Sequence, residues 1–105
     1  MARDVTPLTG VIAPNLTFFN PDLTIATDPT VAHARRLLDQ GCVGLAPFGT
    51  TGEALSVGVD ERIATLKALI SGGIDPKRLI PGTGLTALAD TARLSRACLE
   101  AGAAG

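Results

Sequence analysis

Residues 48–53 (FGTTGE), here called the threonine loop, have the residue types of a small-molecule site. The loop directly follows an apolar run predicted to be a strand and precedes a predicted helix, which is where parallel α/β proteins bind ligands. The hydroxyls of Thr50 and Thr51 supply hydrogen-bond donors and acceptors, and backbone N–H groups left unpaired in a loop can hold a carboxylate or phosphate. The two glycines predict close backbone approach and unusual dihedral angles. Residue chemistry alone explains the loop equally well as an ordinary polar turn.

Residues 82–87 (GTGLTA), here called the glycine loop, have the G-x-G-x-x-A form of a dinucleotide-binding turn. In that motif an acidic residue about 20 positions later ends the following strand. Glu100 has nearly this spacing but falls inside a predicted helix, and the strand before the loop is very short. A glycine-bearing turn in a barrel loop is the better interpretation, with a nucleotide-binding module as the alternative.

The remaining reactive side chains show no catalytic arrangement. His33 lies in a predicted helix beside two arginines, with no partner in view, which favours a surface or helix-packing role. Cys42 and Cys98 match no metal-ligand or disulfide spacing, and we expect free thiols that pack as small core residues. The sequence predicts no metal and no cofactor.

Glycine and proline divide the chain into short apolar runs that alternate with helical patterns. The predicted strands are centred on Ile12, Leu45 and Ile80, spaced 33 and 35 residues apart. Such alternation implies a parallel sheet with right-handed helical crossovers, which is an α/β fold. A fourth strand is expected to begin at residues 103–105.

Each predicted helix has recognisable ends. The first begins with Asp28 at the N-cap and Pro29 at the first helical position, and it ends at Gly41 in the left-handed conformation. Gly58 caps the second helix. The third runs from about residue 86, with Thr86 as its cap, to about residue 101.

Composition excludes several classes of protein. The chain has 105 residues, the size of one domain, and its net charge of −1 argues against a nucleic-acid partner. Aromatic residues make up only 3%, so a base-stacking surface is not expected. No apolar run approaches the roughly 20 residues of a membrane span, and Met1–Asp4 do not start a secretory signal. We therefore expect a cytoplasmic protein with no membrane partner.

The five residues after Phe48 resemble the signature of the dihydrodipicolinate synthase/N-acetylneuraminate lyase family. The segments ALS at 54–56, DER at 60–62 and LIPGTG at 79–84 agree with the family in order and spacing. The resemblance runs from about residue 10 to the end of the chain. It implies a Schiff-base-forming, pyruvate-dependent aldolase on a (β/α)₈ TIM barrel, assembled as a homotetramer. Residues 1–105 would then form the N-terminal part of a single lyase domain, about three βα units, with no internal domain boundary.

The resemblance also implies roles for individual residues. Thr50 would belong to a hydroxyl relay that moves protons, and Thr51 would bind the carboxylate of pyruvate or a related 2-oxo acid. Gly49 would approach the ligand through its backbone, and Thr17 would contribute near the end of the first strand. The family usually has Thr-Pro-Phe there, whereas this chain has Phe at position 18. Glu53 is expected to orient the loop.

The Schiff-base lysine and relay tyrosine of the family are expected downstream. This chain has no tyrosine, and its lysines, Lys67 and Lys77, fall in a helix and a turn, neither of which offers the desolvated pocket that a Schiff-base lysine needs. We therefore expect residues 1–105 to be inactive alone. A non-catalytic truncated barrel fragment stays open as an alternative. The Thr-Thr pair is more similar to synthase-type members than to sialic-acid lyases.

Overall fold

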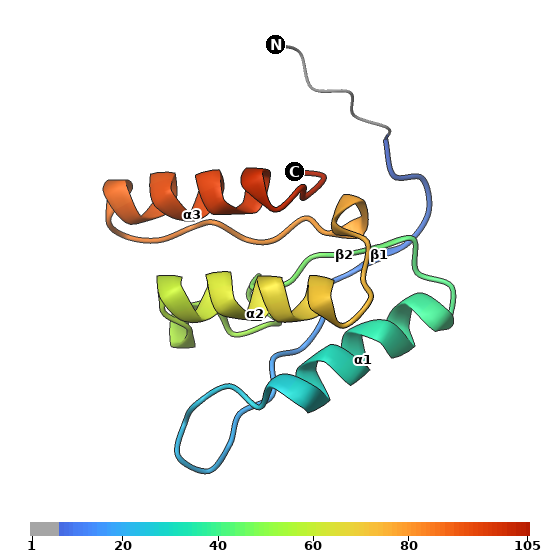
Figure 1. Cartoon of the computed structure of the whole chain (residues 1–105), viewed down its shortest axis with the longest axis horizontal. Helices are drawn as coiled ribbons and strands as arrows, with labels where there is room; N and C mark the ends of the chain where they lie inside the picture. The colour runs from blue at the N-terminus through green and yellow to red at the C-terminus, as the bar shows by residue number, and fades with distance from the viewer. Residues whose placement is uncertain (1–6) are drawn as a thin grey trace.

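The computed structural model describes residues 7–105, so Met1–Asp4 and the signal prediction attached to them lie outside the described residues. The first two strand–helix units are present as predicted, but no third strand separates the second and third helices within residues 7–105 (Figure 1). Within residues 7–105, no helix combines the length and apolarity needed to cross a bilayer. The elements are β1 (Ile12–Ala13), α1 (Thr27–Asp39), β2 (Gly44–Leu45), the 3₁₀ turn η1 (Ala54–Ser56), α2 (Val59–Ser71), the 3₁₀ turn η2 (Pro76–Arg78) and α3 (Leu88–Glu100).

Strands β1 and β2 pair in parallel, with Ile12 opposite Gly44 and Ala13 opposite Leu45. Parallel pairing requires a crossover, and α1 supplies it. The parallel pairing continues one residue beyond β2, where the Ala46 N–H donates to the Ala13 carbonyl at 2.8 Å. The carboxyl ends of β1 and β2 therefore lie at one edge of the sheet.

The predicted third strand is reduced to a single parallel bridge between Leu45 and Leu79. The η2 turn occupies the residues before Leu79, and Pro81 has no N–H to donate two residues later. The segment around Leu79 nevertheless forms backbone hydrogen bonds to chain on both of its sides. The Ile80 N–H donates to the Leu45 carbonyl, and the Ala104 N–H donates to the Leu79 carbonyl, both at 2.9 Å. The latter bond lies where a fourth strand was expected.

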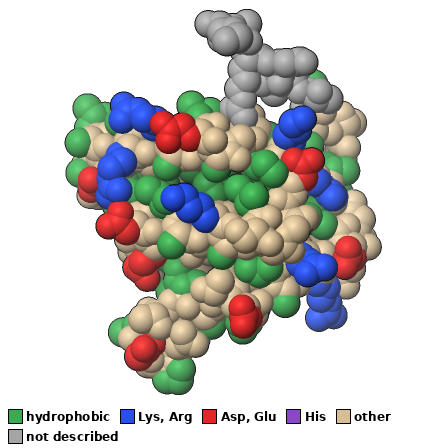
Figure 2. All heavy atoms as spheres, viewed as in Figure 1, with side chains coloured by type: hydrophobic (Ala, Val, Ile, Leu, Met, Phe, Trp, Pro, Cys, Tyr) green, Lys and Arg blue, Asp and Glu red, His purple; other side chains and the backbone are tan. Residues whose placement is uncertain are grey.

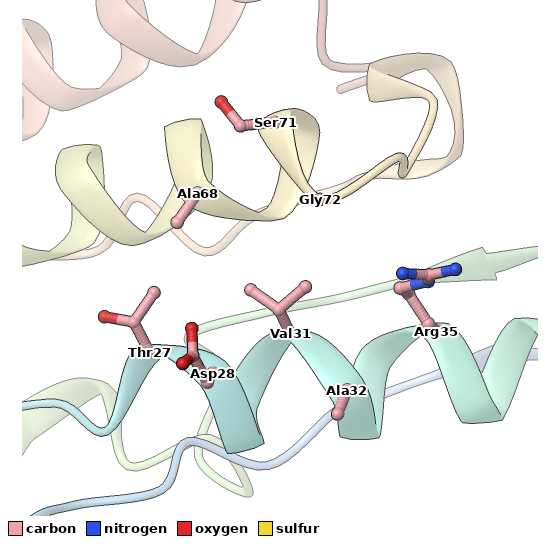
Figure 3. Close-up of a pocket in the computed structure, with 8 residues that line it drawn as sticks. All are labelled: Thr27, Asp28, Val31, Ala32, Arg35, Ala68, Ser71 and Gly72. Carbon is pink, nitrogen blue, oxygen red and sulfur yellow. The ribbon is translucent and has the colours of Figure 1, made fainter.

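The three helices form one layer, in which α2 lies between α1 and α3 (Figure 1). Charged side chains are spread over the outer surface of this layer, with apolar side chains visible between them (Figure 2). Helices α1 and α2 approach closely at Gly72, where a Cβ atom would come within 2.5 Å of the Val31 side chain. An open groove of about 380 Å³ lies beside this contact (Figure 3), and none of the predicted site residues lines it.

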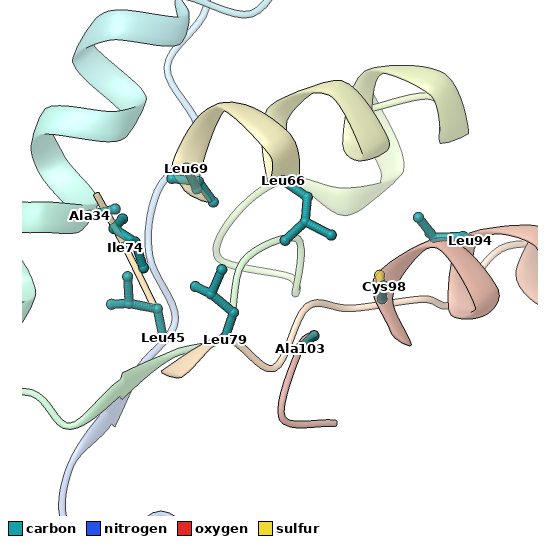
Figure 4. Close-up of a cluster of buried hydrophobic side chains, with 9 residues drawn as sticks. All are labelled: Ala34, Leu45, Leu66, Leu69, Ile74, Leu79, Leu94, Cys98 and Ala103. Atoms are coloured by element: carbon teal, nitrogen blue, oxygen red, sulfur yellow. The ribbon is translucent and has the colours of Figure 1, made fainter. Parts of the chain in front are cut away.

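The core lies between the helical layer and the strands (Figure 4). Successive side chains in a strand point to opposite faces. Leu45 and Leu79, both fully buried, face the helices, so Ile80 and the half-exposed Ile12 point to the opposite face. The buried cluster consists of Ala34, Leu45, Leu66, Leu69, Ile74, Leu79, Leu94, Cys98 and Ala103.

The ends of α1 and α2 follow their sequence signals with one exception. Gly41 has φ 110°, and Gly58 is the N-cap of α2, as predicted. The Glu61 carboxylate accepts a hydrogen bond from the Gly58 N–H at 3.1 Å and secures this end. The prediction of Asp28 as N-cap of α1 is wrong, because the cap is Ala26 and Asp28 lies in the first turn.

Side-chain hydroxyls explain the two helix starts that the sequence misplaced. Thr30 donates to the Ala26 carbonyl at 2.8 Å and accepts from the Phe18 N–H at 3.0 Å, which ties the start of α1 to the segment after β1. The prediction of Thr86 as the cap of α3 is also wrong. Ala87 is the N-cap, and the Thr91 hydroxyl accepts from the Leu85 N–H at 3.2 Å.

Candidate functional site

The threonine loop leaves the carboxyl end of β2 and exposes both of its threonines. Two backbone bonds give it a fixed form: the Glu53 N–H donates to the Thr50 carbonyl and the Ala54 N–H donates to the Gly49 carbonyl, each at 3.1 Å. The turn η1 follows immediately. The loop thus presents the Thr50 and Thr51 side chains to solvent on a hydrogen-bonded backbone.

The unusual dihedral angles predicted for the two glycines occur at other residues. Phe48 has φ 61° and Glu53 has φ 57°, whereas neither Gly49 nor Gly52 has a positive φ. A left-handed conformation costs an ordinary residue roughly 1–2 kcal/mol. Phe48 is only 3% exposed, so packing of its ring offsets this cost. Backbone strain therefore flanks Thr50 and Thr51 on both sides.

Gly52 fulfils the other prediction, close backbone approach. A Cβ atom there would lie 3.0 Å from both the Asn15 carbonyl oxygen and the Phe48 nitrogen. The Thr17 hydroxyl, in a residue only 8% exposed, donates to the Gly52 carbonyl at 2.8 Å. The segment after β1 and the threonine loop after β2 are therefore in direct contact.

Four consecutive backbone amides in this loop have no protein partner among residues 7–105. They belong to Gly49, Thr50, Thr51 and Gly52. No atom would lie within 4 Å of a Cβ at Gly49, so the backbone there is open to a ligand. Unpaired amides in a turn carry partial positive charge and favour an anion. The arrangement can bind a carboxylate or a phosphate.

Sequence reasoning missed Arg62, whose side chain contacts the turn η1 that directly follows the threonine loop. The residue is 1% exposed, and its burial lowers the pKa of the guanidinium from its ordinary value. It donates to the carbonyls of Ala54 at 2.5 Å, Val57 at 3.1 Å and Gly84 at 3.1 Å. The available signal was its position four residues before Leu66, on the apolar stripe of α2.

The glycine loop packs against the threonine loop. The Gly82 N–H donates to the Pro47 carbonyl at 2.8 Å, and the Gly84 carbonyl accepts from Arg62. Glu100 lies in α3, as predicted, and does not end a strand. The glycine pair is thus used for contact between two loops, which disfavours the dinucleotide alternative.

His33 has partners that the sequence did not reveal. Its Nε2 accepts from the Leu16 N–H at 3.1 Å, and its ring meets the Phe18 ring edge-on with centroids 5.4 Å apart. The ring therefore braces the segment that contains Thr17. This agrees with the packing role expected for His33.

The lysines and cysteines occupy the predicted environments, except that Cys42 is only partly buried. Lys67 and Lys77 are both exposed. Cys98 lies in the core, and burial raises the pKa of its thiol. Both cysteines are free thiols.

Comparisons with known proteins agree with this geometry. A model of the dihydrodipicolinate synthetase family matches residues 7–105. The 4-hydroxy-tetrahydrodipicolinate synthase of Mycobacterium leprae (strain Br4923) is 36% identical over 104 residues, which are 99% of this chain and 33% of that protein. The chain therefore spans about a third of the length of the curated relatives that it matches.

Solved structures give the same result. Dihydrodipicolinate synthase from Agrobacterium tumefaciens str. C58 matches with a TM-score of 0.84 and 41% identity, covering 90% of this chain and 33% of that chain. YagE, a prophage protein from E. coli K12 solved in complex with pyruvate, matches with a TM-score of 0.81 and 31% identity, covering 93% and 33%. The predicted TIM-barrel fold class is confirmed. The chain belongs to the dihydrodipicolinate synthetase family of lyases.

Proposed function

We propose that the full-length protein carrying this chain forms or cleaves a carbon–carbon bond of pyruvate or a related 2-oxo acid through a lysine Schiff base. The observation that carries the proposal is the threonine loop, with two exposed hydroxyls and four unpaired amides at a strand end. Membership of the family and the structural similarity to a pyruvate-bound relative support the choice of ligand.

The loop's chemistry suits the carboxylate of a 2-oxo acid. Thr51 and the neighbouring amides donate to the carboxylate oxygens, and a hydrogen bond to a charged group contributes about 1.5–3 kcal/mol. Gly49 allows the ligand to approach the backbone, because the space beside its α-carbon is open. Thr17 supports binding through Gly52, to which its hydroxyl donates.

The covalent step takes place at a lysine outside residues 1–105. Its neutral amine attacks the ketone carbon, water leaves, and the resulting imine acidifies the neighbouring methyl group. Loss of a proton gives an enamine, whose carbon attacks an aldehyde; the reverse sequence cleaves the bond. Thr50 relays protons between this site and a tyrosine that also lies outside residues 1–105.

Borohydride trapping tests the function directly. Pyruvate and borohydride should add one reduced pyruvyl group per subunit of the full-length protein, on a lysine other than Lys67 and Lys77. Residues 1–105 alone should gain no adduct, because both of their lysines are exposed. Intact-mass measurement reads the result. A full-length protein that gains no adduct would contradict the proposal.

From the same family membership we propose a cytoplasmic homotetramer for the full-length protein. Sedimentation velocity measures the assembly. A monomer at micromolar concentration would contradict it.

A further inference from the structure

Arg62 carries a buried positive charge whose partners are all backbone carbonyls. Its guanidinium donates to Ala54, the residue after the threonine loop, to Val57 at the end of η1, and to Gly84 in the glycine loop. Among residues 7–105 the one ion pair joins Arg93 and Asp60, so no carboxylate of this part of the chain neutralises Arg62. The side chain therefore acts as a clamp between two loops.

A second hydrogen bond, made by Ala54, connects Arg62 to the part of the threonine loop that contains the unpaired amides. Arg62 fixes the Ala54 carbonyl, and the Ala54 N–H donates to the Gly49 carbonyl at 3.1 Å. A trans peptide is planar, with its C=O and N–H pointing in opposite directions. Because the Gly49 carbonyl is directed at Ala54, the Thr50 N–H points away from Ala54.

We propose that Arg62 is a positioning residue that orients the Thr50 amide for a bound carboxylate and sets the spacing between the threonine and glycine loops. The proposal rests on the proposed function, since the carboxylate is that of the 2-oxo acid. Lysine cannot replace Arg62, because an ammonium is a compact donor on a flexible stem. A guanidinium reaches several carbonyls at once from one rigid plane.

Arg78 provides a matched control. It also donates only to backbone carbonyls, to Val43 at 2.9 Å and to Cys42 at 2.8 Å. These acceptors precede β2, whereas the threonine loop follows it. Substitution of Arg78 therefore removes a similar clamp without touching the candidate site.

The test compares Arg62→Lys and Arg78→Lys in the full-length protein, with pyruvate as the probe. Each variant is characterised by its thermal midpoint and by the pyruvate concentration that gives half-maximal borohydride trapping. We expect both variants to lose stability. Arg62→Lys should raise the half-maximal concentration about tenfold, equivalent to about 1.4 kcal/mol of binding, and Arg78→Lys by less than about twofold. Equal shifts in the two variants overturn the proposal.

Hydrogen exchange separates this proposal from the proposed function. If the wild-type protein traps no pyruvate, the proposed function fails. The role of Arg62 is then tested by the exchange rate of the Ala54 amide. This rate should increase about tenfold in Arg62→Lys and stay unchanged in Arg78→Lys. A tenfold increase corresponds to about 1.4 kcal/mol less free energy of local opening. Equal rates overturn the clamp.

A measurement on the wild-type protein covers the case in which Arg62→Lys does not fold. The Ala54 amide should then exchange more slowly than the Thr50 amide of the same loop, because only the former has a hydrogen-bond acceptor among residues 7–105. Equal exchange of the two amides overturns the proposal.

Discussion

Gly82 lies so close to Phe48 that a Cβ atom at Gly82 would overlap the Phe48 carbonyl oxygen. Phe48 is also the strained residue that begins the threonine loop, with φ 61°. The contact therefore joins the start of the glycine loop to the start of the threonine loop. The Gly82 N–H strengthens it by donating to the Pro47 carbonyl at 2.8 Å.

Gly82→Ala should destabilise the full-length protein, because backbone has to move to admit the methyl group. Overpacking of this kind costs typically about 1–3 kcal/mol. Gly84→Ala is the control, since a Cβ atom there would meet nothing within 4 Å. Urea unfolding measures both variants. Equal stabilities of the two variants would show that the loops separate without cost.

Thr51→Val and Thr50→Val should damage different steps of the reaction. Thr51→Val deletes hydrogen bonds to the carboxylate and should weaken pyruvate binding by about 1.5–3 kcal/mol. Thr50→Val removes the proton relay and should lower turnover by roughly 10²–10⁴-fold. Steady-state kinetics separates the two effects. Thr27→Val, in an exposed residue at the start of α1, is the control, and site variants that match it would remove these roles.

Cys98 should make stability fall at alkaline pH. Burial raises the pKa of its thiol in the folded state, whereas an unfolded chain releases the proton near roughly pH 8.5. The stabilisation is therefore fully present below the unfolded pKa and is lost as pH rises toward the folded pKa. Thermal midpoints between about pH 7 and 10 should fall more steeply for the wild type than for Cys98→Ala.

Cys42→Ala is the control for this experiment, because Cys42 is only partly buried. It should retain the wild-type slope. A Cys98→Ala variant whose midpoint depends on pH as the wild type does would assign the alkaline loss to other groups.

Residues 1–105 expressed alone should self-associate or bind a hydrophobic dye. The face of the strands opposite the helices carries Ile12, which is 36% exposed, and the partly exposed Ile80. A large aliphatic side chain left in water forgoes about 1.5–3 kcal/mol, a sizeable part of a domain's net stability of about 5–15 kcal/mol. Sedimentation velocity and dye fluorescence check this. A sharply melting monomer that binds no dye would show that this segment is self-sufficient.

Local signals predicted the order of elements and several of their ends. The helix ends at Gly41 and Gly58 have local signals: Gly41 has a positive φ, which glycine adopts readily, and Gly58 bonds to Glu61 three residues later. The prediction of Asp28 as N-cap failed because the start of α1 is set by Thr30, whose hydroxyl accepts from the N–H of Phe18, twelve positions away. A cap that depends on such a contact leaves no local signal.

The motif at residues 49–53 was sufficient to find the candidate site and the family, since the residue types that bind a carboxylate stand together in the chain. The backbone conformation of the threonine loop could not be predicted from these residue types. The left-handed residues are Phe48 and Glu53 rather than the glycines, because contacts with the glycine loop and with Asn15 decide where the backbone bends.

Arg62 separates what the sequence predicts from what only the tertiary structure decides. Its place on an apolar stripe was visible in the sequence, but its acceptors include Gly84, which is 22 positions away. A buried guanidinium needs acceptors for its N–H groups, and here backbone carbonyls from separate segments provide them. These segments come together only after α2 packs against the two loops, so tertiary structure alone assigns Arg62 to the site.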